Sequence, residues 1–206
     1  LPIAKRCITA LGAETGFGKS AWANQCGWTL AMRGDARVLI ANVELSPALL
    51  IARQVARLTG RNGEAPVHPL AILRGTTSQP EARRVAEVFE ELRPALDRVT
   101  IATSCNHIDH IKRDIRQHEP DIVVLDYIQR IKAGRDLEVR QSMNQLAEDM
   151  RRMADDGLAV VAVSAMNRNW DKKSASGFRE SSEVEDGADF AGTLSHEVAD
   201  GKIIGD

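Results

Sequence analysis

The sequence is poor in cysteine and in long apolar runs. Only three of its 206 residues are cysteine, and an odd number of widely spaced thiols argues against a disulfide-stapled secreted domain. No stretch approaches the roughly 18 consecutive apolar residues that a membrane-spanning helix needs, and no signal-peptide pattern opens the chain. We therefore expect a reduced, cytoplasmic protein with no membrane partner.

An excess of charge of one sign is also missing. The 27 basic and 29 acidic residues leave a formal net charge of −2, so the composition by itself does not indicate nucleic-acid binding, and any basic surface has to be local. Repeats, long low-complexity linkers and a nucleophile-elbow arrangement of Ser, His and Asp are absent as well. With 43% hydrophobic residues, the chain can bury one core, and we expect a single domain over 1–206.

Short apolar runs alternate with amphipathic segments along the chain. Most runs lack polar alternation, which is typical of strands buried on both faces of a parallel sheet. The runs are 6–11, 38–43, 99–103, 121–125 and 158–164, and the segments predicted to be helices are 19–32, 47–59, 79–96, 108–118 and 139–155. This alternation predicts an α/β fold with a mostly parallel central sheet flanked by helices.

A glycine-rich stretch, GAETGFGKSA at 12–21, lies between a predicted strand and a predicted helix. Gly16 and Gly18 permit a turn that points successive N–H groups inward, and the helix N-terminus adds partial positive charge. Lys19 would contact terminal phosphates, and the Ser20 hydroxyl would ligate Mg²⁺. A glycine turn entering a helix is the alternative, but Lys-Ser directly after the turn favours a phosphate loop. The candidate nucleotide-binding residues here are Ala13, Glu14, Thr15, Gly16, Phe17, Gly18, Lys19, Ser20 and Ala21.

Two carboxylates end predicted strands, where open parallel sheets bind their ligands. Asp126 ends DIVVLD and could hold Mg²⁺ or its waters; the alternative is a side chain that caps the following turn. Glu44 ends VLIANVE and could polarise the attacking water as a general base; the alternative is a solvent-facing glutamate. Together with Lys19 they form a candidate catalytic set for nucleotide hydrolysis.

From about residue 6 to about residue 197, the sequence resembles the C-terminal RecA-like ATPase domain of DnaB-type replicative helicases. The resemblance implies a RecA-like P-loop NTPase fold and an ATP hydrolase that uses Mg²⁺. It also implies a homo-oligomer, a hexameric ring, that moves along single-stranded DNA, with a primase or a helicase loader as a further partner. The segments that carry it are GAETGFGKS at 12–20, NVELSPALLIARQVA at 42–56, DIVVLDYIQRI at 121–131, VAVSAMNR at 161–168 and FRESSEVEDGADF at 178–190.

The resemblance also assigns roles to single residues. It makes Glu44 the catalytic glutamate, and it places Arg53, further along the same helix, near the bound nucleotide. Alanine is common at the first position of the family's phosphate loop, so Ala13 fits. In the channel-loop stretch, Arg179 and Glu180 would grip the single-strand backbone, with Ser182 at a family glycine position.

The polar segment 167–178 predicts a mobile loop. Arg168, Lys172 and Lys173 surround Trp170 there and could hold a DNA backbone while the indole stacks on a base. Charge alone favours a solvated loop with one hydrophobic anchor. The resemblance puts channel-lining loops in this region, and with it DNA contact and a solvated loop are about equally favoured.

The sequence departs from the family pattern at three points. Ala165 replaces the glutamine that senses the terminal phosphate, and a methyl group cannot hydrogen-bond a phosphate oxygen. The chain also ends at Asp206, before the family's basic pair that enters the neighbouring site, and the N-terminal primase-binding domain is expected to be absent. Two alternatives therefore stay open: a weakly hydrolysing nucleotide-binding assembly subunit, and a RecA-type ATPase of recombination or repair.

His107 and His110 lie three residues apart on a predicted helix, so a metal pair is conceivable. No third ligand accompanies them within reach in the sequence. Surface histidines on an amphipathic helix are the favoured interpretation.

Overall fold

The computed structural model describes residues 1–34, 36–134, 137–166, 184, 187–194, 197–199 and 202–204. Within them, a six-stranded sheet has the order β3-β2-β4-β5-β1-β6, and every neighbouring pair is parallel. Its strands are β1 (Ile8–Ala13), β2 (Val38–Asn42), β3 (Val99–Ile101), β4 (Ile122–Asp126), β5 (Ala159–Ala165) and β6 (Phe190–Leu194). The predicted α/β class with a mostly parallel sheet is confirmed. Two further strands, β7 (Glu197–Ala199) and β8 (Lys202–Ile204), pair antiparallel with each other.

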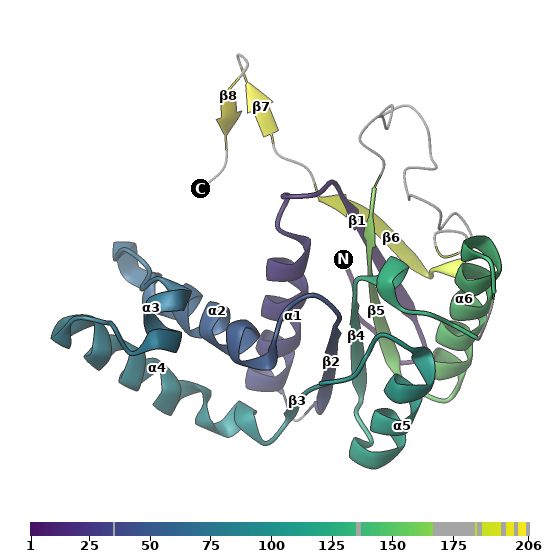
Figure 1. Cartoon of the computed structure of the whole chain (residues 1–206), viewed down its shortest axis with the longest axis horizontal. Coiled ribbons are helices and arrows are strands. Elements are labelled where there is room, and N and C mark those ends of the chain that lie inside the picture. Colours follow the sequence, from purple (N-terminus) through teal and green to yellow (C-terminus); the bar gives the residue numbers. More distant parts are fainter. Residues whose placement is uncertain are drawn as a thin grey trace.

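Helices cover both faces of the sheet (Figure 1). Helices α1 to α4 lie on one side and α5 and α6 on the other. The helices are α1 (Lys19–Arg33), α2 (Pro47–Thr59), α3 (Pro69–Arg74), α4 (Gln79–Leu96), α5 (Ile108–His118) and α6 (Val139–Asp155), with 3₁₀ turns η1 (Arg61–Gly63) and η2 (Ile128–Arg130). In this part of the chain, no helix combines the length and apolar character of a membrane span.

All of the predicted strands and helices are present, and the bounds of α2, α4, α5 and α6 agree with the prediction. The first strand lies further along than the predicted run 6–11 and includes Ala13. Among the helices and strands, sequence periodicity missed α3, β6, β7 and β8. Helix α3 is a short helix on which Leu70 and Leu73 stay exposed, and β6 is an edge strand that is only partly buried.

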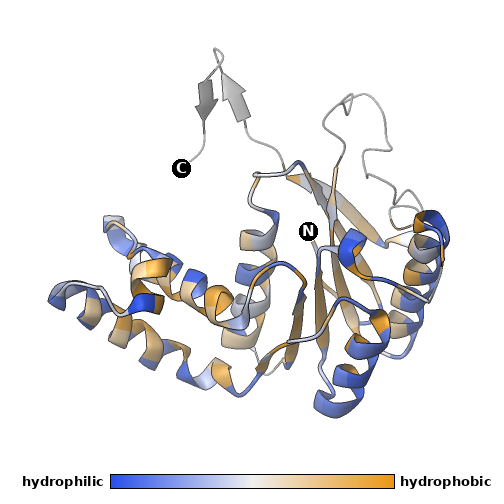
Figure 2. Ribbon diagram, viewed as in Figure 1, coloured by the Kyte–Doolittle hydropathy of each residue, from blue (hydrophilic) through white to orange (hydrophobic). Residues whose placement is uncertain are grey.

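Alternate residues of each strand face opposite sides of the sheet, and both sides are apolar. In β4, Val123 and Leu125 pack beneath α5 and α6, whereas Ile122 and Val124 pack beneath α1 and α4. Figure 2 shows β2 and β4 in hydrophobic colours, while α5 is mostly hydrophilic. Because side chains alternate with period two, Asp126 has the parity of Val124 and faces α1. The alternating pattern of the strand thus directs the Asp126 carboxylate towards α1.

The helices of the α1 side begin in different ways. The Ser46 side chain accepts a hydrogen bond from the Leu49 N–H (3.3 Å), and Pro47 occupies the first turn of α2. The Ser78 N–H at the start of α4 donates to the Glu81 carboxylate (2.7 Å). Both arrangements satisfy backbone groups that a helix start leaves without partners. Helix α1 begins instead at Gly18, and within the described residues no side chain caps it.

Candidate nucleotide-binding site

A cavity of about 380 Å³ opens beside the start of α1, at the carboxyl ends of the strands. Its volume falls in the range of small-ligand pockets, about 300–1,000 Å³. It is lined by Thr15, Gly16, Gly18, Lys19, Ser20, Ala21, Glu44, Arg53, Tyr127 and Ala165. All of them except Tyr127 and Ala165 are predicted site residues. Segments far apart in the sequence therefore meet where the pattern of the strands predicts a ligand.

The phosphate-loop stretch forms the turn that the glycines predict. Gly16 has φ 91° and Gly18 has φ 82°, both in the left-handed region that favours glycine. The Lys19 ammonium donates to the Glu14 carbonyl oxygen (2.9 Å), which holds the side chain against the loop. Because the first amides of α1 have no intrahelical acceptor, their N–H groups are available to an anion.

The remaining predicted loop residues are not part of the cavity lining. Ala13 is fully buried as the last residue of β1, where it pairs with Ala165 and Leu194. The Phe17 N–H donates to the Glu14 carbonyl (3.3 Å) and closes the turn. These residues shape the loop through their backbone.

Asp126 is joined to α1 and β2 by hydrogen bonds. The Ser20 hydroxyl donates to Asp126 Oδ1 (3.2 Å), and the Asn42 amide donates to Asp126 Oδ2. The Asn42 side-chain oxygen in turn accepts from the N–H groups of Glu44 (3.0 Å) and Leu45 (2.7 Å). Asn42 thus ties the aspartate to the turn that carries the second carboxylate.

Burial dominates the electrostatics of this centre. Asp126 is only 2% exposed, and this burial raises the pKa of its carboxyl to about 6, with a further upward contribution from Glu44. Hydrogen bonds from Ser20 and Asn42 and the charge of Lys19 oppose the rise. Burial also lowers the pKa of the Lys19 ammonium, against the attraction of Asp126 and Glu44.

The oxygen atoms of Ser20 and Asp126 suit a magnesium ion. Mg²⁺ prefers hard oxygen ligands and is usually held by one or two carboxylates together with substrate phosphates. A buried carboxylate whose charge is incompletely balanced, with a hydroxyl beside it, is such a donor set. The residues present therefore fit the predicted ion.

Glu44 lies on the turn between β2 and α2 and lines the cavity. Its side chain is 45% exposed, so it is accessible to water. The Arg130 guanidinium lies 3.9 Å from Glu44 Oε1 and donates to the Tyr127 hydroxyl (2.8 Å). Arg53 reaches the same cavity from α2 and is exposed.

Sequence reasoning missed the residues that hold these groups in place. Asn42 is a buried polar residue at the end of β2, directly opposite Asp126 in the register of the parallel pair. The Gln129 amide donates to Ser164 Oγ (2.7 Å) and accepts from the Ala165 N–H (3.2 Å), which fastens η2 to the end of β5. Asn42 could have been found from the sequence, because it is a polar residue at the end of an apolar strand.

The predicted DNA-binding residues Arg168, Lys172, Lys173, Arg179, Glu180 and Ser182 lie outside the described residues, as does the predicted loop 167–178. The histidine pair is described. The His107 ring nitrogen Nδ1 accepts from the Asp109 N–H (3.3 Å) at the start of α5. In the described part of the chain, no group of three or more potential metal ligands occurs.

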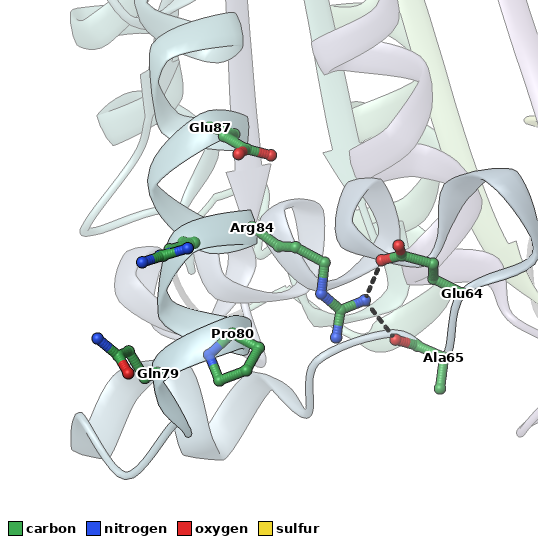
Figure 3. A pocket seen from close by; sticks show the side chains of 7 residues that line it. Glu64, Ala65, Gln79, Pro80, Arg84 and Glu87 are labelled. Atoms are coloured by element: carbon green, nitrogen blue, oxygen red, sulfur yellow. Dashed lines mark hydrogen bonds and ion pairs between the residues drawn. The ribbon is translucent and has the colours of Figure 1, made fainter.

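A second and larger pocket, of about 640 Å³, lies away from this site between α4 and the segment before α3 (Figure 3). The Arg84 guanidinium crosses it to bind the Glu64 carboxylate (2.7 Å) and the carbonyl oxygens of Thr59 (3.1 Å) and Ala65 (3.0 Å). Since these bonds join α4 to the last residue of α2 and to the chain that follows it, we assign Arg84 a structural role.

Curated proteins with similar sequences are named as helicases. The chain is 25% identical over 197 residues to a Chlamydia trachomatis protein (serovar L2) named "Probable plasmid replicative DNA helicase", covering 91% of this chain and 42% of that protein. A protein of the same name from Chlamydia muridarum is 23% identical and covers 87% and 40%. The chain thus spans less than half the length of these curated relatives.

Two solved structures share the fold. One of them, an ATPase domain, has a TM-score of 0.78 at 20% identity, covering 92% of this chain and 69% of that one. The other, a DnaB-like replicative helicase solved in a study of its interactions with primase, has a TM-score of 0.78 at 21% identity, covering 93% and 47%. These likenesses confirm the RecA-like arrangement of the sheet. Residues 3–200 match the DnaB-like helicase C-terminal domain, and the chain belongs to this family.

Proposed function

We propose that this chain is the motor domain of a DNA helicase, which hydrolyses ATP with Mg²⁺ and uses the energy to move along single-stranded DNA. The observation that carries the proposal is the meeting of Lys19, Glu44 and the Ser20–Asp126 pair at one cavity. They come from three separate segments, and each supplies a group that phosphoryl transfer needs.

In this proposal, the start of α1 binds the triphosphate. The loop N–H groups and the partial positive charge of the helix surround the phosphates. The Lys19 ammonium leaves the Glu14 carbonyl, its acceptor in the described structure, and contacts the terminal phosphates. Arg53 lies at the cavity wall and would contact the nucleotide from α2.

Ser20 and Asp126 would hold Mg²⁺ with their oxygen atoms. When bound, the ion neutralises charge that develops on the phosphate oxygens. Asn42 keeps Asp126 in place through its amide. Because burial disfavours the charged carboxylate, Asp126 gains a favourable partner when a cation arrives.

Glu44 would act as the general base. Its carboxylate lines the cavity and is accessible to water. A carboxylate in this position accepts a proton from the attacking water as the water oxygen bonds to the terminal phosphorus and the bond from that phosphorus to the bridging oxygen breaks, which releases ADP and inorganic phosphate. Only a group within hydrogen-bond reach of that water can do so, and among the described lining residues Glu44 is the one carboxylate.

DNA contact would come from the segment that follows β5. That strand ends at Ala165, which lines the nucleotide cavity, and the predicted DNA-binding residues follow in the sequence. We propose that Arg168, Lys172, Lys173, Arg179, Glu180 and Ser182 face single-stranded DNA inside a hexameric ring of this one domain. A primase or a helicase loader is the further partner, and the cytoplasm is the proposed location.

The test is the rate of ATP hydrolysis with and without single-stranded DNA, read together with unwinding of a forked duplex. A motor hydrolyses ATP, accelerates on DNA and separates the fork. Hydrolysis that DNA stimulates without any unwinding would favour a RecA-type ATPase of recombination or repair. Size-exclusion chromatography with and without nucleotide tests the ring.

One observation favours a second candidate, a nucleotide-binding assembly subunit that hydrolyses ATP weakly. Ala165 lines the cavity, where its methyl group offers no hydrogen bond to a phosphate oxygen. The nearby Gln129 amide does not replace it, because that amide is engaged with Ser164 and the Ala165 backbone. Tight nucleotide binding with a turnover rate that DNA leaves unchanged would support this candidate.

A further inference from the structure

Arg130 is an exposed cation beside the nucleotide cavity that the proposed mechanism does not use. Its guanidinium has two neighbours, each from a different part of the site. Nε donates to the Tyr127 hydroxyl (2.8 Å), and Nη2 lies 3.9 Å from Glu44 Oε1. The guanidinium carbon also lies 5.9 Å from the centre of the Tyr127 ring. Arg130 therefore bridges two residues that line the cavity.

The backbone that carries Arg130 is firmly held. Ile128 is fully buried in the core under α5 and α6. Gln129 is bonded to both the N–H and the carbonyl oxygen of Ala165 (3.2 Å each). With η2 fastened to the core and to β5, the backbone from which the Arg130 side chain extends is fixed, and the hydrogen bond to Tyr127 holds its guanidinium end.

Glu44 needs such a partner. Its backbone is held by Asn42, but its side chain is nearly half exposed. Its carboxylate is repelled by that of Asp126 and would be repelled by a bound triphosphate. Once Lys19 turns to the phosphates, Arg130 is the cation from the described residues that an ion-pair distance links to Glu44.

We propose that Arg130 is a positioning residue, which holds the Glu44 carboxylate at the cavity rim in the orientation that activates water. The inference rests on the proposed function, because it assigns a partner to the general base. The Tyr127 hydroxyl holds Nε, so that Nη2 faces Glu44. A planar guanidinium can make both contacts at once, whereas an ammonium serves as a single point charge.

The experiment compares Arg130→Gln and Arg130→Lys with the parent protein in steady-state ATP hydrolysis and in binding of a fluorescent ATP analogue. For Arg130→Gln, we expect kcat to fall roughly tenfold, as for a misplaced catalytic group, with KM and analogue affinity unchanged. Arg130→Lys should recover part of the loss because it keeps the charge. Arg116→Gln, an exposed arginine on α5, is the matched control and should behave like the parent.

Non-additivity separates positioning from a general structural effect. With Glu44→Gln already present, Arg130→Gln should lower turnover no further, because the group it positions is gone. Unchanged kcat in Arg130→Gln, or a raised KM at constant kcat, would overturn the proposal while leaving the ATPase function intact. A parent protein that binds ATP without turning it over would instead refute the proposed function, and the role of Arg130 with it.

Discussion

Helices α1 and α2 each follow a strand of the same parallel sheet, yet their N-termini differ in how the first backbone amides are satisfied. At α2, Ser46 accepts from the Leu49 N–H and Pro47 has no N–H to satisfy. The Asn42 side chain takes the amides of Glu44 and Leu45 just before it. At α1, the cap is Gly18, and in the described structure no side chain accepts from the first turn.

The difference separates the start of α2, which the protein's own side chains cap, from the start of α1, which we propose binds phosphate. The Ser46 cap holds the first turn of α2 in place, so α2 can serve as a fixed support for Glu44 and Arg53. An uncapped terminus with no acidic residue in its first turn has amides that only water or a ligand can satisfy. Each carboxylate of the site is tied to one of these starts: Asp126 to α1 through Ser20, and Glu44 to α2.

The first prediction tests whether the N-terminus of α1 is an anion site. Lys19→Ala removes the ammonium that lines the cavity, so we expect ATP affinity to fall by about 30-fold or more, because losing one partner of a buried charge contact costs about 2–5 kcal/mol. Titration with a fluorescent ATP analogue measures it. Lys132→Ala, at an exposed position outside the cavity lining, is the control. If Lys19→Ala bound ATP as tightly as the parent protein, the N-terminus of α1 would not be the proposed anion site.

The second prediction concerns Glu44, the carboxylate before the start of α2, and the rate of ATP turnover. Glu44→Gln keeps the size of the side chain but removes its basicity, so we expect nucleotide binding to persist while turnover falls by about 10²–10⁴-fold. Phosphate release under saturating ATP measures the change. Hydrolysis as fast as that of the parent would remove Glu44 from the mechanism.

The third prediction concerns Asp126, whose buried carboxylate we expect to lower the stability of the folded protein while it supports Mg²⁺ binding. The folded-state pKa of Asp126, about 6, exceeds the ordinary value of 3.8. Proton binding therefore stabilises the folded state fully below about pH 4, and this contribution is lost as the pH rises through 6. Asp126→Asn is neutral at every pH, so at pH 7.5 we expect its free energy of unfolding without nucleotide to exceed the parent's by up to about 3 kcal/mol.

Urea denaturation at pH 7.5 and pH 4 measures this difference, which should shrink at the lower pH. The same variant should lose the Mg²⁺ dependence of nucleotide binding, because a neutral amide is a poor ligand for Mg²⁺. A less stable Asp126→Asn protein at pH 7.5 would contradict the assigned electrostatics.

The smallest effect tests the capped terminus. Ser46→Ala removes the side-chain acceptor of α2, so we expect the free energy of unfolding to fall by about 1 kcal/mol with ATP affinity unchanged. Thermal denaturation and analogue titration together measure it. Ser46→Gly, which costs only a few tenths of a kcal/mol at such positions, is the matched comparison. A large loss of affinity in Ser46→Ala would show that the two helix starts are not independent.

Much of the architecture could be read from local patterns. Apolar runs such as 121–125 predict doubly buried strands, and apolar stripes at helical spacing predict α6, where Met143, Leu146 and Met150 are buried. The loop at 12–21 was recognisable because its chemistry lies in consecutive residues. Short or half-exposed elements escaped, since α3 and β6 bury too little for periodicity to reveal them.

By itself, the sequence determined most of the strands and helices and the position of the proposed phosphate loop, because these depend on neighbours along the chain. Only the tertiary structure decided which strand ends meet. The register that places Asn42 opposite Asp126, the contact between Arg130 and Glu44 and the attachment of Gln129 to Ala165 all join different strands or turns. Such contacts depend on strand order and side-chain direction within the folded sheet, which no local pattern encodes.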